Sequence, residues 1–239
     1  DAGIATIDHL DGYVAALMPA DTDRSGGYGG FFDVLLVDQV DPERIAGVVA
    51  QTVAAGTWNV PTQSLIEQLV NDTSVAELGN RPDMRYMPRA TVRQWIRAKE
   101  NQLGERGFSP EIGARAIELR RQIIYALHEA GAGLLLGSDA PQIFNVPGFS
   151  LHHELGFLVA AGLTPYEALS TGTTAVAEFL GTNTGTIETG READLVLLDA
   201  NPLLDISNSR RVHGVMVRGE WFSFTDLEKR LADFLSEDE

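Results

Sequence analysis

The spacing of apolar and polar positions changes along this chain. Segments with the spacing typical of strands are followed by segments with the spacing typical of helices. Short β-type runs cover residues 3–9 and 56–62, and a third run, apolar over residues 131–137, leads to Asp139. Helical spacing covers residues 45–55, 64–78, 91–102, 110–130 and 150–161. The long segment 110–130 places Ile117, Ile123, Ile124 and Leu127 on one face, as a half-buried helix would. Strand followed by helix, three times over, predicts βα units in a parallel sheet.

Local signals mark where two of these helices begin. Asp41-Pro42-Glu43 combines an acceptor side chain, a proline in the first turn and an acid near the helix N-terminus. The run Thr164-Pro165-Tyr166-Glu167 has the spacing of a capping box. We therefore expect helices to start at both places.

The apolar run over residues 131–141 ends in a carboxylate, Asp139. Such a run fits a parallel strand covered on both faces, and barrel enzymes gather their chemistry where such strands end. Asp139 is therefore the first candidate for a catalytic residue. Without further context, a turn or cap carboxylate is the commoner interpretation of such an aspartate.

The pattern changes after residue 180. Glycines separate short β runs over residues 195–198 and 212–217, which predicts a small antiparallel element. An acidic amphipathic segment, residues 226–239, closes the chain as a predicted helix. We expect three parts: residues 1–180, residues 181–224 and residues 225–239.

The composition of the chain limits which classes of partner and which metal ligands are expected. The chain has 239 residues, 44% apolar, and a net charge of -16, which disfavours nucleic acid as a partner. Without cysteine, a metal site would need His, Asp or Glu ligands. No apolar run approaches the ~20 residues of a membrane helix. Because the chain starts at Asp1, directly before a strand, we expect an upstream part, and the compartment stays unsettled with the cytoplasm favoured.

Several motifs occur in a familiar order. They are Ile7-Asp8-His9, Gly137-Ser138-Asp139-Ala140-Pro141, the run 161–169, the run 185–196 and Asn201-Pro202-Leu203. Together they resemble the C-terminal half of a metal-dependent amidohydrolase, closest to the imidazolonepropionase-like and Xaa-Pro or Xaa-Arg dipeptidase-like branch. The resemblance implies an α/β fold in which this chain supplies strands six to eight of a (β/α)8 TIM barrel and part of a small β-sandwich.

The resemblance also assigns roles. It implies one or two divalent ions, zinc first, with His9 and Asp139 as metal ligands and Asp139 as the catalytic proton carrier. His9 would contact substrate instead in a one-metal version, and without the family it is a hydrogen-bonded core histidine. The family's His-x-His pair is missing, because the only close pair, His152-His153, is adjacent on a predicted helix. We therefore expect a partner that supplies the N-terminal half of the barrel, as a separate chain or a further segment, and a homo-oligomer.

Loop residues 142–149 after Asp139 are expected to line a substrate pocket, with Phe144, Asn145 and His152 as the candidate contacts. The expected substrate is a dipeptide or an N-acyl amino acid, with a cyclic amide or imidazolone as the alternative. A catalytically silent half-barrel that serves as a scaffold is the alternative from another class. The glycine-rich run 25–30 lacks the Lys-Ser/Thr of a phosphate loop and is expected to be a loop near the barrel mouth.

Overall fold

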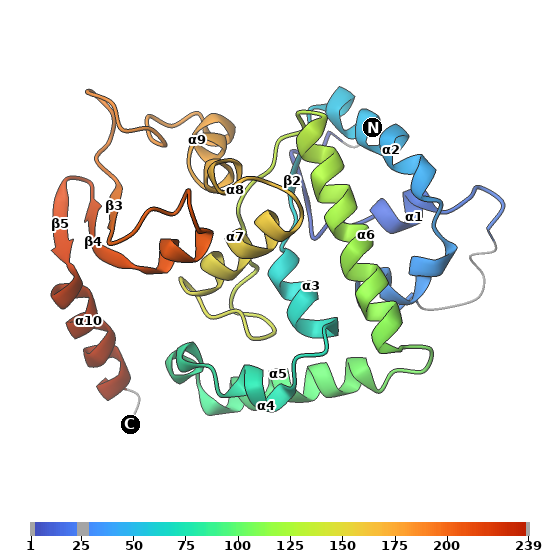
Figure 1. The fold of residues 1–239 in the computed structure, drawn as a ribbon, viewed down its shortest axis with the longest axis horizontal. Coiled ribbons are helices and arrows are strands. Elements are labelled where there is room, and N and C mark those ends of the chain that lie inside the picture. Colours follow the sequence, from blue (N-terminus) through green and yellow to red (C-terminus); the bar gives the residue numbers. More distant parts are fainter. Residues whose placement is uncertain (1–2, 23–28, 238–239) are drawn as a thin grey trace. The chain divides into compact units, whose positions relative to one another are not determined.

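The computed structural model describes residues 3–22 and 29–237, so most of the glycine-rich run 25–30 lies outside the described residues. Figure 1 shows the order of the elements. The strands are β1 (Thr6–Asp8), β2 (Trp58–Val60), β3 (Leu195–Leu198), β4 (Val212–Val217) and β5 (Glu220–Ser223). The α-helices are α1 (Tyr13–Leu17), α2 (Ile45–Ala55), α3 (Gln63–Val70), α4 (Val75–Gly79), α5 (Arg89–Leu103), α6 (Pro110–Glu129), α7 (Ser150–Ala160), α8 (Pro165–Thr171), α9 (Thr174–Leu180) and α10 (Phe224–Glu237). Shorter 3₁₀ segments are η1 (Phe31–Gln39), η2 (Pro42–Arg44), η3 (Pro82–Tyr86) and η4 (Ile206–Arg210).

The chain divides into two compact units, residues 1–162 and residues 163–239. The change of pattern after residue 180 falls inside the second unit, which groups α8 and α9 with the strands β3 to β5. The division into residues 1–180, 181–224 and 225–239 stays a prediction.

Three extended segments lie side by side and parallel in the first unit. β1 pairs with β2 from Thr6↔Trp58 to Asp8↔Val60. On its other side, β2 meets the apolar run through a parallel bridge between Asn59 and Leu134. The three extended segments therefore run parallel to one another, as predicted for the three βα units.

The third segment is not a full strand, so the prediction of a strand ending at Asp139 is wrong in its extent. Its ladder bonds with β2 run only from Gly133 O, which accepts from Asn59 N at 2.8 Å, to Leu135 N, which donates to Asn59 O at 2.9 Å. β2 ends at Val60, and the chain then turns through Pro61 and Thr62. Beyond Leu135, β2 therefore offers no further backbone to pair with.

Helix α3 lies at the centre of the first unit. All eight of its residues are buried, and it packs against α5, α6 and α7 (Figure 1). The prediction of one helix over residues 64–78 is wrong, because α3 ends at Val70 and α4 starts at Val75. The Ser74 side chain accepts from Glu77 N and caps this new helix.

The predicted helix starts are confirmed. Asp41 accepts a hydrogen bond from Glu43 N at 3.0 Å, before η2 and α2. Thr164 and Glu167 form a complete capping box at the start of α8. The long amphipathic helix is also confirmed as α6, with Ile123, Ile124 and Leu127 fully buried.

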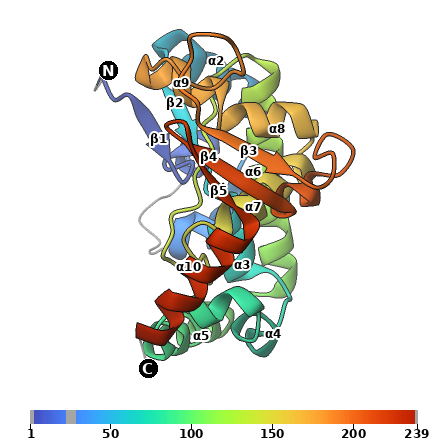
Figure 2. The ribbon, with the colours of Figure 1, turned by 90° about the vertical axis from the view of Figure 1, so that its left-hand side faces the viewer.

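The second unit contains one antiparallel sheet in the order β3-β4-β5, as predicted for the β runs after residue 180. Figure 2 shows the three strands next to one another, with α10 directly after β5. The predicted closing helix is therefore confirmed. A β-sandwich built on this sheet stays a prediction.

Within residues 3–22 and 29–237, no helix has the length and apolar character needed to cross a membrane.

Candidate functional site

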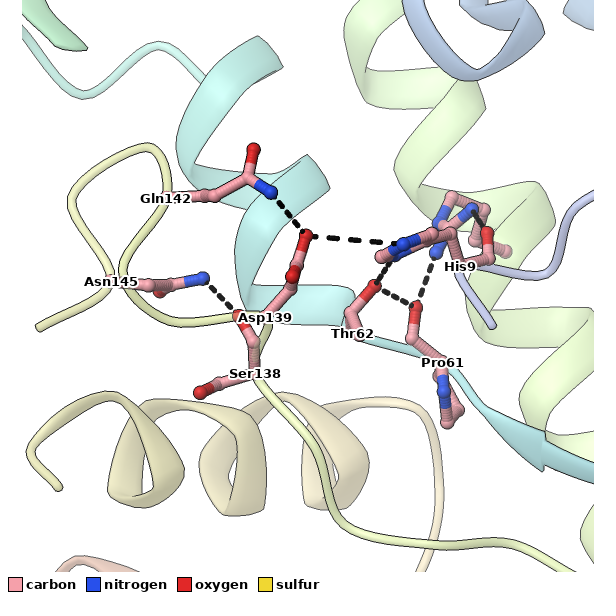
Figure 3. A network of polar contacts seen from close by, with 8 residues as sticks. His9, Pro61, Thr62, Ser138, Asp139, Gln142 and Asn145 are labelled. Atoms are coloured by element: carbon pink, nitrogen blue, oxygen red, sulfur yellow. Dashed lines mark hydrogen bonds and ion pairs between the residues drawn. The ribbon is translucent and has the colours of Figure 1, made fainter. Parts of the chain in front are cut away.

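The structure brings together the two residues that the sequence singled out. His9 directly follows β1, Asp139 follows the apolar run, and His9 Nε2 lies 3.9 Å from Asp139 Oδ2 (Figure 3). Both side chains are partly exposed, 25% for His9 and 29% for Asp139. Two parallel segments thus end at the same edge with their polar side chains facing each other. Their roles in metal binding and catalysis stay predictions.

The backbone at this edge adopts an unusual conformation. His9, Thr62 and Asp139 have φ values of 60°, 49° and 54°, in the left-handed region. Non-glycine residues rarely occupy this region, which costs roughly 1–3 kcal/mol each and is concentrated at functional sites. Each of the three lies just past an extended segment, so the chain turns sharply there and directs the side chains to one place.

The His9 ring is held on its far side from Asp139. Its Nδ1 lies 2.8 Å from Thr62 Oγ1, and the Thr62 hydroxyl in turn donates to Pro61 O at 2.7 Å (Figure 3). The Phe32 ring lies against the imidazole, with the two ring centroids 5.2 Å apart. These contacts leave Nε2 as the nitrogen that faces Asp139.

Asp139 is held from the loop that follows it. Gln142 Nε2 donates to Asp139 Oδ2 at 3.0 Å, the same oxygen that faces His9 (Figure 3). The next residues, Ile143 and Phe144, also have left-handed φ values of 38° and 60°. Gln142 thus contacts the carboxylate from three residues further along the chain, and the loop turns again directly after it.

Phe144 and Asn145 do not face an open pocket in the structure. Both are fully buried. Phe144 packs in a cluster with Trp95, at a ring-centroid distance of 6.0 Å, and Asn145 Nδ2 donates to Ser138 O at 2.5 Å. These contacts fix the loop beside Asp139, and substrate contact by Phe144 and Asn145 stays a prediction.

His152 lies on α7 and is half-buried. Its neighbour His153 places Nε2 3.9 Å from Asp83 Oδ2, within the same unit. Substrate contact by His152 stays a prediction.

Sequence reasoning missed Arg120, a fully buried residue of α6. Its guanidinium donates to His9 O at 2.7 Å, to Pro61 O at 2.8 Å and to Gln63 Oε1 at 2.9 Å. It therefore ties the ends of β1 and β2 together beneath the site. Burial lowers the pKa of Arg120 to about 10, while the nearby Glu154 carboxylate opposes that shift. Arg120 is thus a cation at neutral pH.

Glu154, on α7, was missed as well. Its two carboxylate oxygens accept from Gln63 N at 2.8 Å and from Ser64 N at 2.6 Å, the first backbone N–H groups of α3. A carboxylate at a helix N-terminus is favourable because it satisfies free donors and complements the helix dipole. Burial raises the pKa of Glu154 to about 7, against the effect of these hydrogen bonds and of Arg120.

Lys99 holds the other end of α3. Its buried Nζ donates to Gln68 O at 2.7 Å, and to Asn71 O and Oδ1 at 2.9 and 2.8 Å. Burial lowers the pKa of Lys99 to about 8. An anion at the first turn and a cation at the last turn thus fix α3 along its axis, and with it Thr62, which precedes α3.

A second histidine–aspartate pair lies in the second unit. His213 Nδ1 lies 2.9 Å from Asp199 Oδ1, and their side chains are 60% and 50% exposed. The pair borders a pocket of about 330 Å³ with Ser223, Phe224 and Thr225. The Ser223 hydroxyl donates to Asp226 Oδ2 at 2.5 Å, so it is engaged elsewhere. The pair is an exposed hydrogen-bonded contact beside the sheet.

His9 and Asp139 fit part of a divalent metal site. Zinc ligands lie about 2.1 Å from the ion, so two ligands of one ion lie at most ~4.2 Å apart. The observed 3.9 Å satisfies this limit, and a nitrogen with an oxygen is a suitable donor set. Among the residues that the structure describes, no group of three His, Cys, Asp or Glu side chains is placed to hold a metal. Binding of a metal by His9 and Asp139 stays a prediction, and it would need further ligands beyond these two.

The family model of the amidohydrolases matches residues 32–222. The chain therefore belongs to the amidohydrolase family, as its motifs indicated.

Solved structures with the same fold include a bottromycin amidohydrolase, with 22% identity and a TM-score of 0.63. The matched region covers 98% of this chain and 49% of the bottromycin amidohydrolase chain. A Xaa-Pro dipeptidase crystallised with methionine in its active site is 21% identical, with a TM-score of 0.51 over 92% of this chain and 40% of its own. The ochratoxinase of A. niger is 19% identical, with a TM-score of 0.54 over 93% and 37%. The fold is thus α/β and related to the TIM barrel, and the chain spans less than half the length of these structures. No curated protein matches the chain.

Proposed function

We propose that this chain contributes the His9 and Asp139 edge of a metal-dependent hydrolase that cleaves a C–N bond in a small amide. The observation that carries the proposal is the convergence of His9 Nε2 and Asp139 Oδ2, 3.9 Å apart, at the ends of parallel segments. Membership of the amidohydrolase family supports the same reaction class.

His9 and Asp139 are the residues that would hold the ion, zinc being the first choice for nitrogen and oxygen ligands without thiolate. When bound, a divalent ion supplies Lewis acidity, which acidifies water and polarises an amide carbonyl oxygen. Asp139 Oδ2 accepts the proton of the attacking water and returns it to the leaving nitrogen. The Gln142 amide, donating to the same oxygen, keeps the carboxylate oriented during both transfers.

The proposed substrate is a dipeptide or an N-acyl amino acid, with a cyclic amide as the alternative. The names of two similar structures, a Xaa-Pro dipeptidase and a bottromycin amidohydrolase, support an amide of this size.

The proposed partner is the complementary part of the barrel, in another segment or another chain. Two observations support it. The chain spans 49% of the bottromycin amidohydrolase structure and 40% of the Xaa-Pro dipeptidase structure. Among the described residues, the two proposed ligands His9 and Asp139 also lie together without a third His, Cys, Asp or Glu placed to complete a site.

The test uses the protein purified with its natural complement. Elemental analysis should find about one or two divalent ions per active assembly, and Xaa-Pro dipeptides and N-acyl amino acids should be hydrolysed. His9→Asn, which tolerates the left-handed backbone of this position, should lose metal and activity. His213→Asn is the matched control and should keep both. A metal-free, inactive natural assembly would instead identify a scaffold.

A further inference from the structure

The hydroxyl of Thr62 has one hydrogen, and its position determines what Thr62 can do for His9. Thr62 Oγ1 lies 2.7 Å from Pro61 O, which can only accept, and 2.8 Å from His9 Nδ1. With its hydrogen on Pro61 O, the hydroxyl oxygen faces His9 as an acceptor. His9 Nδ1 must then carry the ring proton.

Further contacts hold the backbone on both sides of Thr62, and with it the position of the hydroxyl between Pro61 O and His9 Nδ1. Thr62 is β-branched and held at φ 49°, a conformation that such residues avoid. Glu154 binds the N–H groups of the two residues that follow, Gln63 and Ser64, and Arg120 donates to Pro61 O and His9 O. The Thr62 side chain makes no cap bond to α3, and its hydroxyl contacts Pro61 O and His9 Nδ1 instead.

We infer that Thr62 is a positioning residue that fixes His9 in the tautomer protonated at Nδ1, so that the Nε2 lone pair points toward Asp139. This inference rests on the function proposed above. It identifies Thr62 as the residue that keeps the Nε2 of His9 free to bind a metal. The opposite tautomer would carry its proton on Nε2. The Nε2–H group would then donate toward Asp139, and Nε2 would have no lone pair free for a cation. Partners of this kind typically change metal affinity 10–100-fold.

The first test is NMR of the imidazole nitrogens in the metal-free protein with its natural complement, at about pH 8.5, where histidine is neutral. The chain has five histidines, and the spectrum of His9→Asn identifies the His9 signals by subtraction. The wild type and Thr62→Ser should carry the His9 proton on Nδ1. Thr62→Val, equal in shape but without the hydroxyl, should lose this preference. An Nε2–H form in the wild type, or a Thr62→Val spectrum identical to that of the wild type, overturns the inference.

The second test measures Zn²⁺ affinity in the same proteins. Thr62→Val should bind Zn²⁺ about 10–100-fold more weakly, and Thr62→Ser about as tightly as the wild type. Unchanged affinity in Thr62→Val, together with weakened affinity in His9→Asn, overturns the inference. Unchanged affinity in His9→Asn itself overturns the proposed function instead, and the tautomer measurement then decides the role of Thr62 independently.

Discussion

Two histidine–aspartate pairs, one in each compact unit, differ in what holds the imidazole. In the second unit, His213 bonds Asp199 directly at 2.9 Å, and both side chains are at least half exposed. In the first unit, Thr62 occupies Nδ1 of His9, and Asp139 stands 3.9 Å from Nε2. His213 and Asp199 bond each other directly, whereas His9 Nε2 and Asp139 Oδ2 face each other beyond hydrogen-bond distance. The proposed metal site is therefore at the pair whose two side chains do not bond each other directly.

The largest expected effect comes from comparing substitutions of the two aspartates, Asp139 and Asp199. Asp139→Asn should lower kcat/KM of the completed enzyme about 10⁴-fold, because it removes the proton acceptor and a ligand. The fold should persist, since asparagine accepts the left-handed φ of 54° and can still accept from Gln142. Asp199→Asn should leave turnover at the wild-type level. Circular dichroism and steady-state kinetics check both variants, and retained turnover in Asp139→Asn would remove its catalytic assignment.

The next effect concerns buried and exposed arginines on the same helix, α6. Arg120→Met should lower the free energy of unfolding by about 3–5 kcal/mol, because it strips buried carbonyls of their donor and leaves Glu154 uncompensated. Arg115→Met removes an exposed bidentate pair with Asp38 and should cause no resolvable change. Urea denaturation measures both. Equal stability of the two variants would contradict the view that Arg120 supports the site.

The smallest of these effects depends on pH. Because burial raises the pKa of Glu154 from 4.5 to about 7, the folded protein binds a proton that the unfolded chain releases in this window. Its contribution to stability is complete below about pH 4.5 and is lost as pH rises through about 7. Relative to the wild type, Glu154→Gln should therefore gain stability between these values, by at most about 3 kcal/mol.

The measurement is thermal unfolding of the wild type and Glu154→Gln at several pH values. Glu118→Gln, which removes an exposed carboxylate from α6, corrects for the loss of one negative charge. A stability difference that does not change with pH would show that Glu154 stays ionised in the folded protein throughout.

Local signals in the sequence predicted the elements that depend on neighbouring residues. The caps at Asp41 and Thr164 act within three residues, so they can be recognised in the sequence. The end of α3 depends partly on Lys99, a residue 28 positions beyond Asn71, and the single long helix predicted there was wrong. The extent of the third parallel segment depends on where β2 turns, which its own apolar run does not reveal.

The residues of the site also divide into those that the sequence indicated and those that only the structure revealed. Asp139 was singled out because it ends an apolar run, and His9 was singled out through the resemblance to a known family. The structure brings the two side chains together. Thr62, Arg120 and Glu154 act on residues 53 to 111 positions away, so no local motif shows their partners. One signal was available for Arg120, which occupies the face of α6 that carries Ile117, Ile124 and Leu127. A charge among core positions indicates a buried partner.

The left-handed backbone at His9, Thr62 and Asp139 also limits how this edge can change during evolution or engineering. A replacement must supply the right chemistry and also tolerate a φ near +50°, which favours Gly, Asn, Asp and His over other residues. Glutamate in place of Asp139, or a bulkier donor in place of Thr62, keeps the chemical type but adds backbone cost. Redesigning this edge therefore requires substitutions that are chosen for their backbone conformation first and for their side-chain chemistry second.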